Sequence, residues 1–328
     1  MPGSVVGYGV HHGYFLDNGV PPVDFIAINL YVILIMELLT TRQFTLSHGT
    51  GSNREDEAVT GDIRYIDDGR PKPLMVIAHG YKTFKDWGMF PHIGEYFAQR
   101  GFVTIVINFA RNGVEVGESE IRDWEAFARL TPTSEIDDLH LILDAVDEGA
   151  LEYYGIDTDG THRVLLGHSC GGSVSIITAS ERRDVDAVIT WSAPATFDRF
   201  PDEEKKMWRQ NGKLALPEDP EYGIICIGLE PLDDIENNRE RLDVIDAVRR
   251  LKCPVFIAQG DEDPTVMREE ADALYAMASD KKSGIYQVKS PDHLYGVSHP
   301  YESGSSAHLE QMLDETNRWL GNVFSNNE

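Results

Sequence analysis

A serine flanked by glycines carries the strongest chemical signal in the sequence. Gly167-His168-Ser169-Cys170-Gly171 follows a short apolar run and precedes a segment of helical composition. On such a strand-to-helix turn the serine hydroxyl is raised clear of the sheet, and glycines avoid clashes in the sharp bend. The N-terminus of the following helix directs free backbone N–H groups toward developing negative charge. We therefore predict that Ser169 is a nucleophile for acyl transfer; the alternative is a glycine-rich turn that only begins a helix.

An acid that could support this serine follows it in the chain. A serine nucleophile needs a histidine to accept its proton and a carboxylate to orient that histidine, and after a turn of this type the order is Ser, then Asp or Glu, then His. The apolar run Val255–Gln259 ends in Gly260 and a turn that bears Asp261 and Asp263. Asp263, just before a proline, is the predicted acid, and Asp261 is the alternative.

Two histidines compete for the role of base. His293 lies in the loop that follows the apolar run Ile285–Val288, whereas His299 lies further along and precedes Pro300. A loop that leaves a parallel sheet passes the carboxyl ends of the strands early, where the serine would be. A residue before proline is also biased toward an extended backbone. We predict His293 as the base and leave His299 as the alternative.

Acyl transfer also requires donors for an oxyanion. The buried run Leu74–Ala78 continues into His79-Gly80-Tyr81, which is typical of a loop that lends a backbone N–H to an oxyanion hole. We predict that the backbone N–H groups of Tyr81 and Cys170 form this hole. His79 is interpreted as a structural residue that holds the loop.

The elements that must position these residues alternate regularly. Short β-branched apolar runs alternate with segments of helical period, which indicates βαβ units and a mostly parallel sheet. Near-continuous apolar runs are typical of strands buried on both faces. The predicted strands are Leu74–Ala78, Val103–Asn108, Val164–Leu166, Ala187–Trp191, Val255–Gln259 and Ile285–Val288. Helical stripes are predicted around Phe90 to Phe97, Ile136 to Val146 and Leu309 to Leu320.

The stretch from about 197 to 250 breaks this rhythm. It is rich in charge, proline and glycine and is longer than the usual connection between strands. We therefore predict an insertion that forms a helical lid. Lids of this kind control which substrates enter a site.

Composition limits the partners. The 55 acidic against 29 basic residues give a formal charge of −26, which repels nucleic acid and anionic membranes. The three cysteines are odd in number and lack CxxC spacing, so neither a disulfide framework nor a zinc site is expected, and a reducing, cytoplasmic location fits. The acidic, lysine-poor surface leaves a halophilic host as one hypothesis beside an ordinary acidic enzyme.

The N-terminal region has a different character. Residues 25–39 form an apolar run interrupted by Asn29 and Glu37, shorter than the roughly 20 residues of a membrane-spanning helix. The first basic residue is Arg42, so the charged start of a signal peptide is missing. We expect neither an anchor nor a signal, and Met36 is an alternative start of the functional product.

These motifs together resemble the α/β-hydrolase superfamily, and within it the dienelactone-hydrolase-like and prolyl-oligopeptidase-like branch. The resemblance covers about residues 42–321, with residues 79–109 similar to the oxyanion-loop region and residues 292–300 to the terminal histidine loop. It implies an α/β fold with a mostly parallel eight-stranded sheet flanked by helices, a Ser-His-Asp triad and no cofactor; the lid-like insertion predicted above would follow the sixth strand. Residues 1–41 are predicted to be an extension and 42–328 the domain. Ser169 stands where dienelactone hydrolases carry a cysteine.

The predicted function is a serine hydrolase that cleaves carboxylic ester or small amide bonds of a small-molecule substrate through Ser169, Asp263 and His293. A small-peptide peptidase shares this machinery and is the alternative among enzymes. A binding protein on a hydrolase fold is the alternative among other classes. No metal, nucleic-acid or membrane partner is expected, and the oligomeric state is left open.

Overall fold

The domain is built on one sheet, whose strands are β1 to β6, β9 and β10. The computed structural model describes residues 38–49, 54, 57–115, 117–158, 160–217, 222–289, 292–304 and 306–325. All of these residues belong to one compact unit, Leu38–Glu328. The eight strands have the order β1-β2-β4-β3-β5-β6-β9-β10. β1 and β2 are antiparallel to their neighbours, and every other pair is parallel. The predicted eight-stranded, mostly parallel sheet is confirmed.

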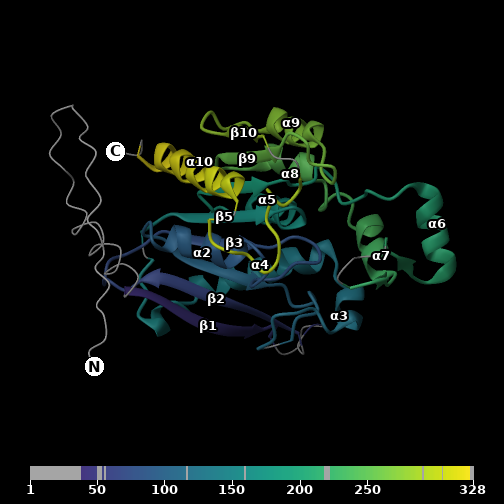
Figure 1. The fold of residues 1–328 in the computed structure, drawn as a ribbon, viewed down its shortest axis with the longest axis horizontal. Helices are drawn as coiled ribbons and strands as arrows, with labels where there is room; N and C mark the ends of the chain where they lie inside the picture. Colours follow the sequence, from purple (N-terminus) through teal and green to yellow (C-terminus); the bar gives the residue numbers. More distant parts are fainter. Residues whose placement is uncertain are drawn as a thin grey trace, which may run out of the picture. The chain divides into compact units, whose positions relative to one another are not determined.

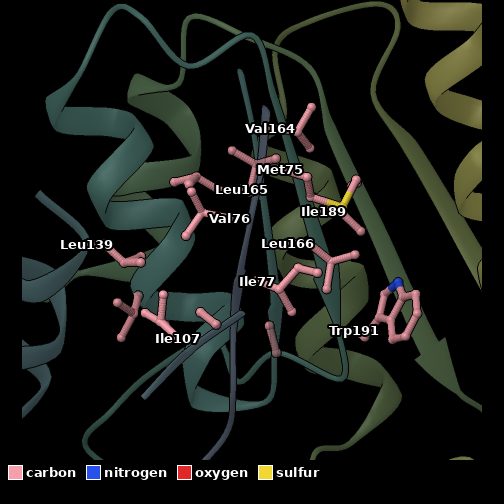
Figure 2. Packing of buried hydrophobic residues seen from close by; sticks show 14 of the residues in the cluster. Met75, Val76, Ile77, Ile107, Leu139, Val164, Leu165, Leu166, Ile189 and Trp191 are labelled. Carbon is pink, nitrogen blue, oxygen red and sulfur yellow. The ribbon is translucent and has the colours of Figure 1, made fainter. Parts of the chain in front are cut away.

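The central strands coincide with the apolar runs of the sequence. They are β3 (Leu74–Ala78), β4 (Val103–Asn108), β5 (Arg163–His168), β6 (Ala187–Trp191), β9 (Val255–Gly260) and β10 (Gly284–Val288). All six predicted strands are confirmed, three of them with the predicted bounds. Figure 2 shows why the runs are continuous: side chains such as Val76, Leu165 and Ile189 pack between the sheet and its helices, and all three are buried.

The two antiparallel strands at the edge were not predicted. β1 (Leu39–Ser47) and β2 (Ala58–Ile66) pair along their whole length. β1 is a partly exposed edge strand that carries Thr, Arg and Gln, and therefore lacks the apolar run of a buried strand. It begins three residues before the predicted domain start at residue 42. The other predictions for the N-terminal region, on residues 25–37 and Met36, lie outside the described residues.

Helices cover the sheet in two layers. α2 (Phe90–Ala98) and α10 (Ala307–Phe324) contact each other and lie on β4 and β10 (Figure 1). The second layer packs through α5 and contains α4 (Pro132–Asp147), α5 (Cys170–Glu181), α8 (Val244–Arg250) and α9 (Arg268–Met277). The short elements α3 (Trp124–Ala128) and η1 (Glu152–Tyr154) flank α4. The three predicted helical stripes are the buried faces of α2, α4 and α10.

The predicted insertion contains secondary structure of its own. α6 (Asp202–Asn211), the small antiparallel pair β7 (Leu214–Ala215) and β8 (Cys226–Ile227), and α7 (Glu230–Asn237) follow the sixth strand. α6 and α7 lie at the right-hand end of the molecule beside α3 (Figure 1). α8 packs against α5 and α9, so the last residues of the predicted insertion belong to the helical layer of the domain. None of the described helices is long and apolar enough to cross a bilayer.

Candidate active site

Ser169 stands at a sharp turn between β5 and α5. Its backbone has φ 53° and ψ −130°, a left-handed region that a serine enters only when the surroundings impose it. The N–H of Ser169 donates to the carbonyl of Trp191, the last residue of the neighbouring strand β6, at 2.8 Å. This hydrogen bond fixes the turn at the carboxyl ends of the two strands. The side chain therefore leaves the sheet, as the motif predicts.

Two glycines permit the close approach of backbone segments around this serine. A Cβ atom on Gly167 would lie 2.2 Å from the carbonyl oxygen of Gly171, and one on Gly80 would lie 2.9 Å from Cβ of Ser169. Both contacts are too short for any larger residue without movement of the chain. The loop after β3 therefore passes directly against the serine, because position 80 has no side chain.

Asp263 and His293 form a hydrogen-bonded pair. Oδ2 of Asp263 accepts from Nδ1 of His293 at 2.7 Å, and Oδ1 accepts from the backbone N–H groups of Thr265 and Val266 at 2.8 and 3.0 Å. Burial alone would raise the pKa of Asp263, but these donors lower it to about 2. The carboxylate is thus ionised near neutral pH and holds the histidine proton on Nδ1, which leaves Nε2 able to accept a proton.

The two alternatives occupy other positions. Asp261 is exposed, and its backbone N–H donates to the carbonyl of Val288. The Nδ1 atom of His299 accepts from the N–H of Gly88 at 3.0 Å, and its ring stacks on Trp87 with the centroids 5.8 Å apart. The geometry brings Asp263 to His293 and gives His299 a structural role.

Two further histidines, His79 and His168, are buried next to the site. His168 donates from Nε2 to the carbonyl oxygen of His293 at 2.9 Å, which connects the loop that carries His293 to the turn at Ser169. Burial, with a contribution from His293, lowers the pKa of His168 to about 3, so it is neutral. His79 donates from Nδ1 to the carbonyl of Gly80 at 2.8 Å, and burial lowers its pKa to about 4, consistent with the structural role expected of it.

The predicted oxyanion donors lie beside the serine. Cys170 is the first residue of α5, where backbone N–H groups have no partner within the helix. Burial raises the pKa of the Cys170 thiol to about 12, against the opposing effect of hydrogen bonds with Ser169 and the backbone N–H of Tyr81. The thiol is therefore protonated, and the backbone N–H of Tyr81 interacts with it.

A cavity of about 520 Å³ opens over Ser169 and His293. The loop after β3 and the start of α4 line it, including Tyr81 and Glu135. The insertion lines it as well, with apolar side chains: Phe197, Phe200, Trp208, Ile227, Pro231 and Ile235. A mostly apolar cavity of this size fits a small organic molecule.

A sequence model of the alpha/beta hydrolase family matches residues 75–319, which include all of these site residues. The chain belongs to the alpha/beta hydrolase family. No curated protein gives a significant sequence match. The comparison with solved structures supports the same fold at low sequence identity.

Three solved structures illustrate this likeness. A protein from Agrobacterium vitis S4 described as a hydrolase has 17% identity and a TM-score of 0.63, covering 86% of this chain and 98% of that one. Est1E from Butyrivibrio proteoclasticus has 16% identity and a TM-score of 0.58, covering 87% and 99%. The acylaminoacyl peptidase of Pyrococcus horikoshii has 17% identity and a TM-score of 0.61, covering 92% of this chain but 44% of the peptidase. The dienelactone-like branch stays a prediction.

Sequence reasoning missed two residues of this alpha/beta hydrolase site. His168 is the variable position of the Gly-x-Ser-x-Gly motif, and its partner His293 lies 125 residues away. Glu135 lies in an ordinary helix start, where an acidic residue is common. Within the described part of the chain, no group of three or more His, Cys, Asp or Glu side chains could hold a metal ion.

Proposed function

We propose that this protein is a serine hydrolase that cleaves carboxylic esters of small molecules through an acyl-enzyme on Ser169. The observation that carries the proposal is the 2.7 Å hydrogen bond between Asp263 and His293, whose histidine lines one cavity with a serine on a strained turn. A nucleophile, a base and an orienting acid in one site are the requirements of acyl transfer.

The proposed reaction has two steps. His293 accepts the hydroxyl proton at Nε2 while Ser169 Oγ attacks the carbonyl carbon, and Asp263 stabilises the resulting imidazolium. The oxyanion binds the backbone N–H groups of Tyr81 and Cys170. His293 then protonates the leaving group, and a water molecule activated by the same histidine releases the acid and restores the serine.

The insertion is proposed to act as a lid that selects substrates. It lines the cavity and is attached to the rest of the domain at two points: the N–H of Gly228 donates to the carbonyl of Ala128 at 2.8 Å, and the N–H of Thr133 donates to the carboxylate of Asp234 at 2.9 Å. Those of its residues that line the cavity would limit the size and shape of the bound group.

A labelling experiment tests the proposal. A fluorophosphonate probe should modify the wild-type protein on Ser169, located by peptide mass spectrometry, and should leave the Ser169→Ala variant unlabelled. A protein that is never labelled would be a binding module on a hydrolase fold. A parallel screen of short-chain and long-chain p-nitrophenyl esters beside aminoacyl arylamides separates an esterase from a small-peptide peptidase, the alternative that uses the same residues.

The compartment is likewise a proposal. Cys170, Cys226 and Cys253 are free thiols in the structure, and free thiols persist in a reducing environment such as the cytoplasm.

A further inference from the structure

Glu135 is the unusual residue of the cavity wall. It lies in the first turn of α4, is only 4% exposed, and lines the same cavity as Ser169. Its Oε1 atom is buried and has no hydrogen-bond partner in the described part of the chain. A buried carboxyl oxygen without a donor is unfavourable, so a donor that a ligand brings to this carboxyl group would stabilise it.

The neighbouring carboxylates already have protein partners. Asp138 accepts from Arg54 and from His48, each at 2.8 Å, and Asp234 accepts from the backbone N–H of Thr133 at 2.9 Å. Glu135 therefore differs from the acids around it, because it is the carboxyl that faces the cavity without a donor from the described residues.

The basic side chains that line the cavity also interact with other groups of the protein. Arg199 donates to both carboxylate oxygens of Glu270 at 2.9 and 2.7 Å and to the carbonyl of Thr265 at 2.7 Å. Lys82 likewise has an interaction of its own. The charges of Asp138 and Asp234 act on Glu135, and both are negative, which favours a cation over an anion.

The rest of the wall suits a cation with an apolar stem. Tyr81, Trp87, Phe200 and Trp208 line the cavity, and aromatic faces attract ammonium groups while aliphatic chains pack against them. We propose that Glu135 binds a protonated amine of the substrate, so that the preferred substrates are esters or amides that carry an ammonium group. This inference rests on the proposed function and names its substrate class.

The protonation state of the empty site agrees with this assignment. Burial raises the pKa of Glu135 well above its usual range, and the charges of Asp138 and Asp234 raise it further. Burial and these charges therefore favour the protonated form of this carboxyl more than water does. An arriving ammonium ion stabilises the carboxylate, and the carboxyl proton is released to solvent. A hydroxyl group would also donate to Glu135, but it carries no positive charge to stabilise the carboxylate form beside Asp138 and Asp234.

Matched esters test the assignment. The substrates are p-nitrophenyl hexanoate, 6-hydroxyhexanoate and 6-aminohexanoate, with the eight-carbon series to vary the reach of the terminal group. Wild type should prefer the amino ester. Glu135→Gln, which keeps the shape but removes the charge, should lower kcat/KM for the amino ester by about 10- to 100-fold, mainly through KM, and change the plain ester by about threefold or less. Glu125→Gln, the same change on an exposed residue of α3, should match wild type on all three.

Two outcomes overturn the inference: an equal loss on all three esters, or a loss confined to the hydroxy ester. A binding experiment separates this failure from failure of the proposed function. Hexylammonium and 1-hexanol are titrated while tryptophan fluorescence is followed, because Trp87 and Trp208 line the cavity. Binding of hexylammonium that Glu135→Gln weakens at least tenfold, in a protein that hydrolyses no ester, would keep the amine site and reject the hydrolase. Hydrolysis without selection for the amine would do the reverse.

Discussion

Two buried carboxyl groups from different regions of the molecule lie at the candidate site: Glu135 lines the cavity, and Asp263 is hydrogen-bonded to His293, which also lines it. Asp263, in the turn after β9, takes part in four hydrogen bonds, from His293, Gln259 and two backbone N–H groups. Glu135, at the start of α4, has an oxygen without a partner among the described residues. Hydrogen bonds lower the pKa of Asp263 to about 2, whereas burial raises that of Glu135. Partners, more than burial, decide which carboxyl carries a charge.

The difference separates two tasks. A carboxylate saturated with protein donors has a fixed charge and a fixed position, which suits the orientation of a catalytic base. A carboxyl with an unused oxygen is stabilised only when a ligand brings a donor, which suits selection. We therefore expect substitution of Asp263 or His293 to lower kcat and substitution of Glu135 to raise KM.

The largest effect should come from the nucleophile. Ser169→Ala should lower kcat by a factor on the order of 10⁶, because the hydroxyl that forms the acyl-enzyme is lost. Steady-state hydrolysis of a p-nitrophenyl ester measures the loss, and circular dichroism should show an unchanged fold. Activity within about tenfold of wild type would place the chemistry elsewhere.

Substitution of the base should have a comparable effect. His293→Ala should remove essentially all hydrolysis and slow fluorophosphonate labelling, by a factor on the order of 10⁶ in kcat. His299→Ala is the matched control: it should keep most activity and lower thermal stability, because it loses the hydrogen bond with Gly88 and the stacking on Trp87. The reverse pattern would make His299 the base.

The orienting acid comes next. Asp263→Asn should lower kcat by about 10⁴-fold with little change in KM, because an amide in this position favours the wrong imidazole tautomer. Asp261→Asn, on the exposed side of the same turn, should behave like wild type. A larger loss from Asp261→Asn would exchange the two roles and break the contrast with Glu135.

The buried strands and the residues that follow them could be predicted from the sequence, whereas the antiparallel strands β1 and β2 could not. β3, β4 and β6 could be predicted to the residue because strands buried on both faces are continuous apolar runs. Ser169, Asp263 and His293 could be proposed because their positions follow strand ends and a known chain order. β1 was not predicted because a partly exposed edge strand has no such run, and β2 was not predicted because its buried positions include Asp62 and Arg64.

Glu135 escaped for a different reason. In the sequence it reads as a first-turn acid, next to the capping box formed by Thr131 and Ser134, and such residues are usually solvated. The cavity that it lines is also lined by the loop after β3 and by the insertion, and the charge of Asp234, about 100 residues away in the chain, acts on it. Local pattern cannot report a burial that distant segments create.

The smallest expected effect is on stability, and it tests whether the two carboxyls differ in charge. For Asp263 the folded pKa is below its ordinary value of 3.8, so its contribution to stability is present above about pH 4 and is lost as pH falls toward 2. For Glu135 the folded pKa is above its ordinary value of 4.5. The folded state then binds more protons than the unfolded state, and wild type loses stability as pH rises above about 4.5.

Glu135→Gln removes this loss, so its Tm relative to wild type should increase by about 2–4 °C between pH 5 and pH 8. Differential scanning fluorimetry at several pH values measures the difference, with Glu125→Gln as the exposed control whose Tm difference should stay constant. A Tm difference for Glu135→Gln that is also independent of pH would mean that Glu135 is ionised in the folded protein. The contrast between a saturated and an unsaturated carboxyl would then be wrong.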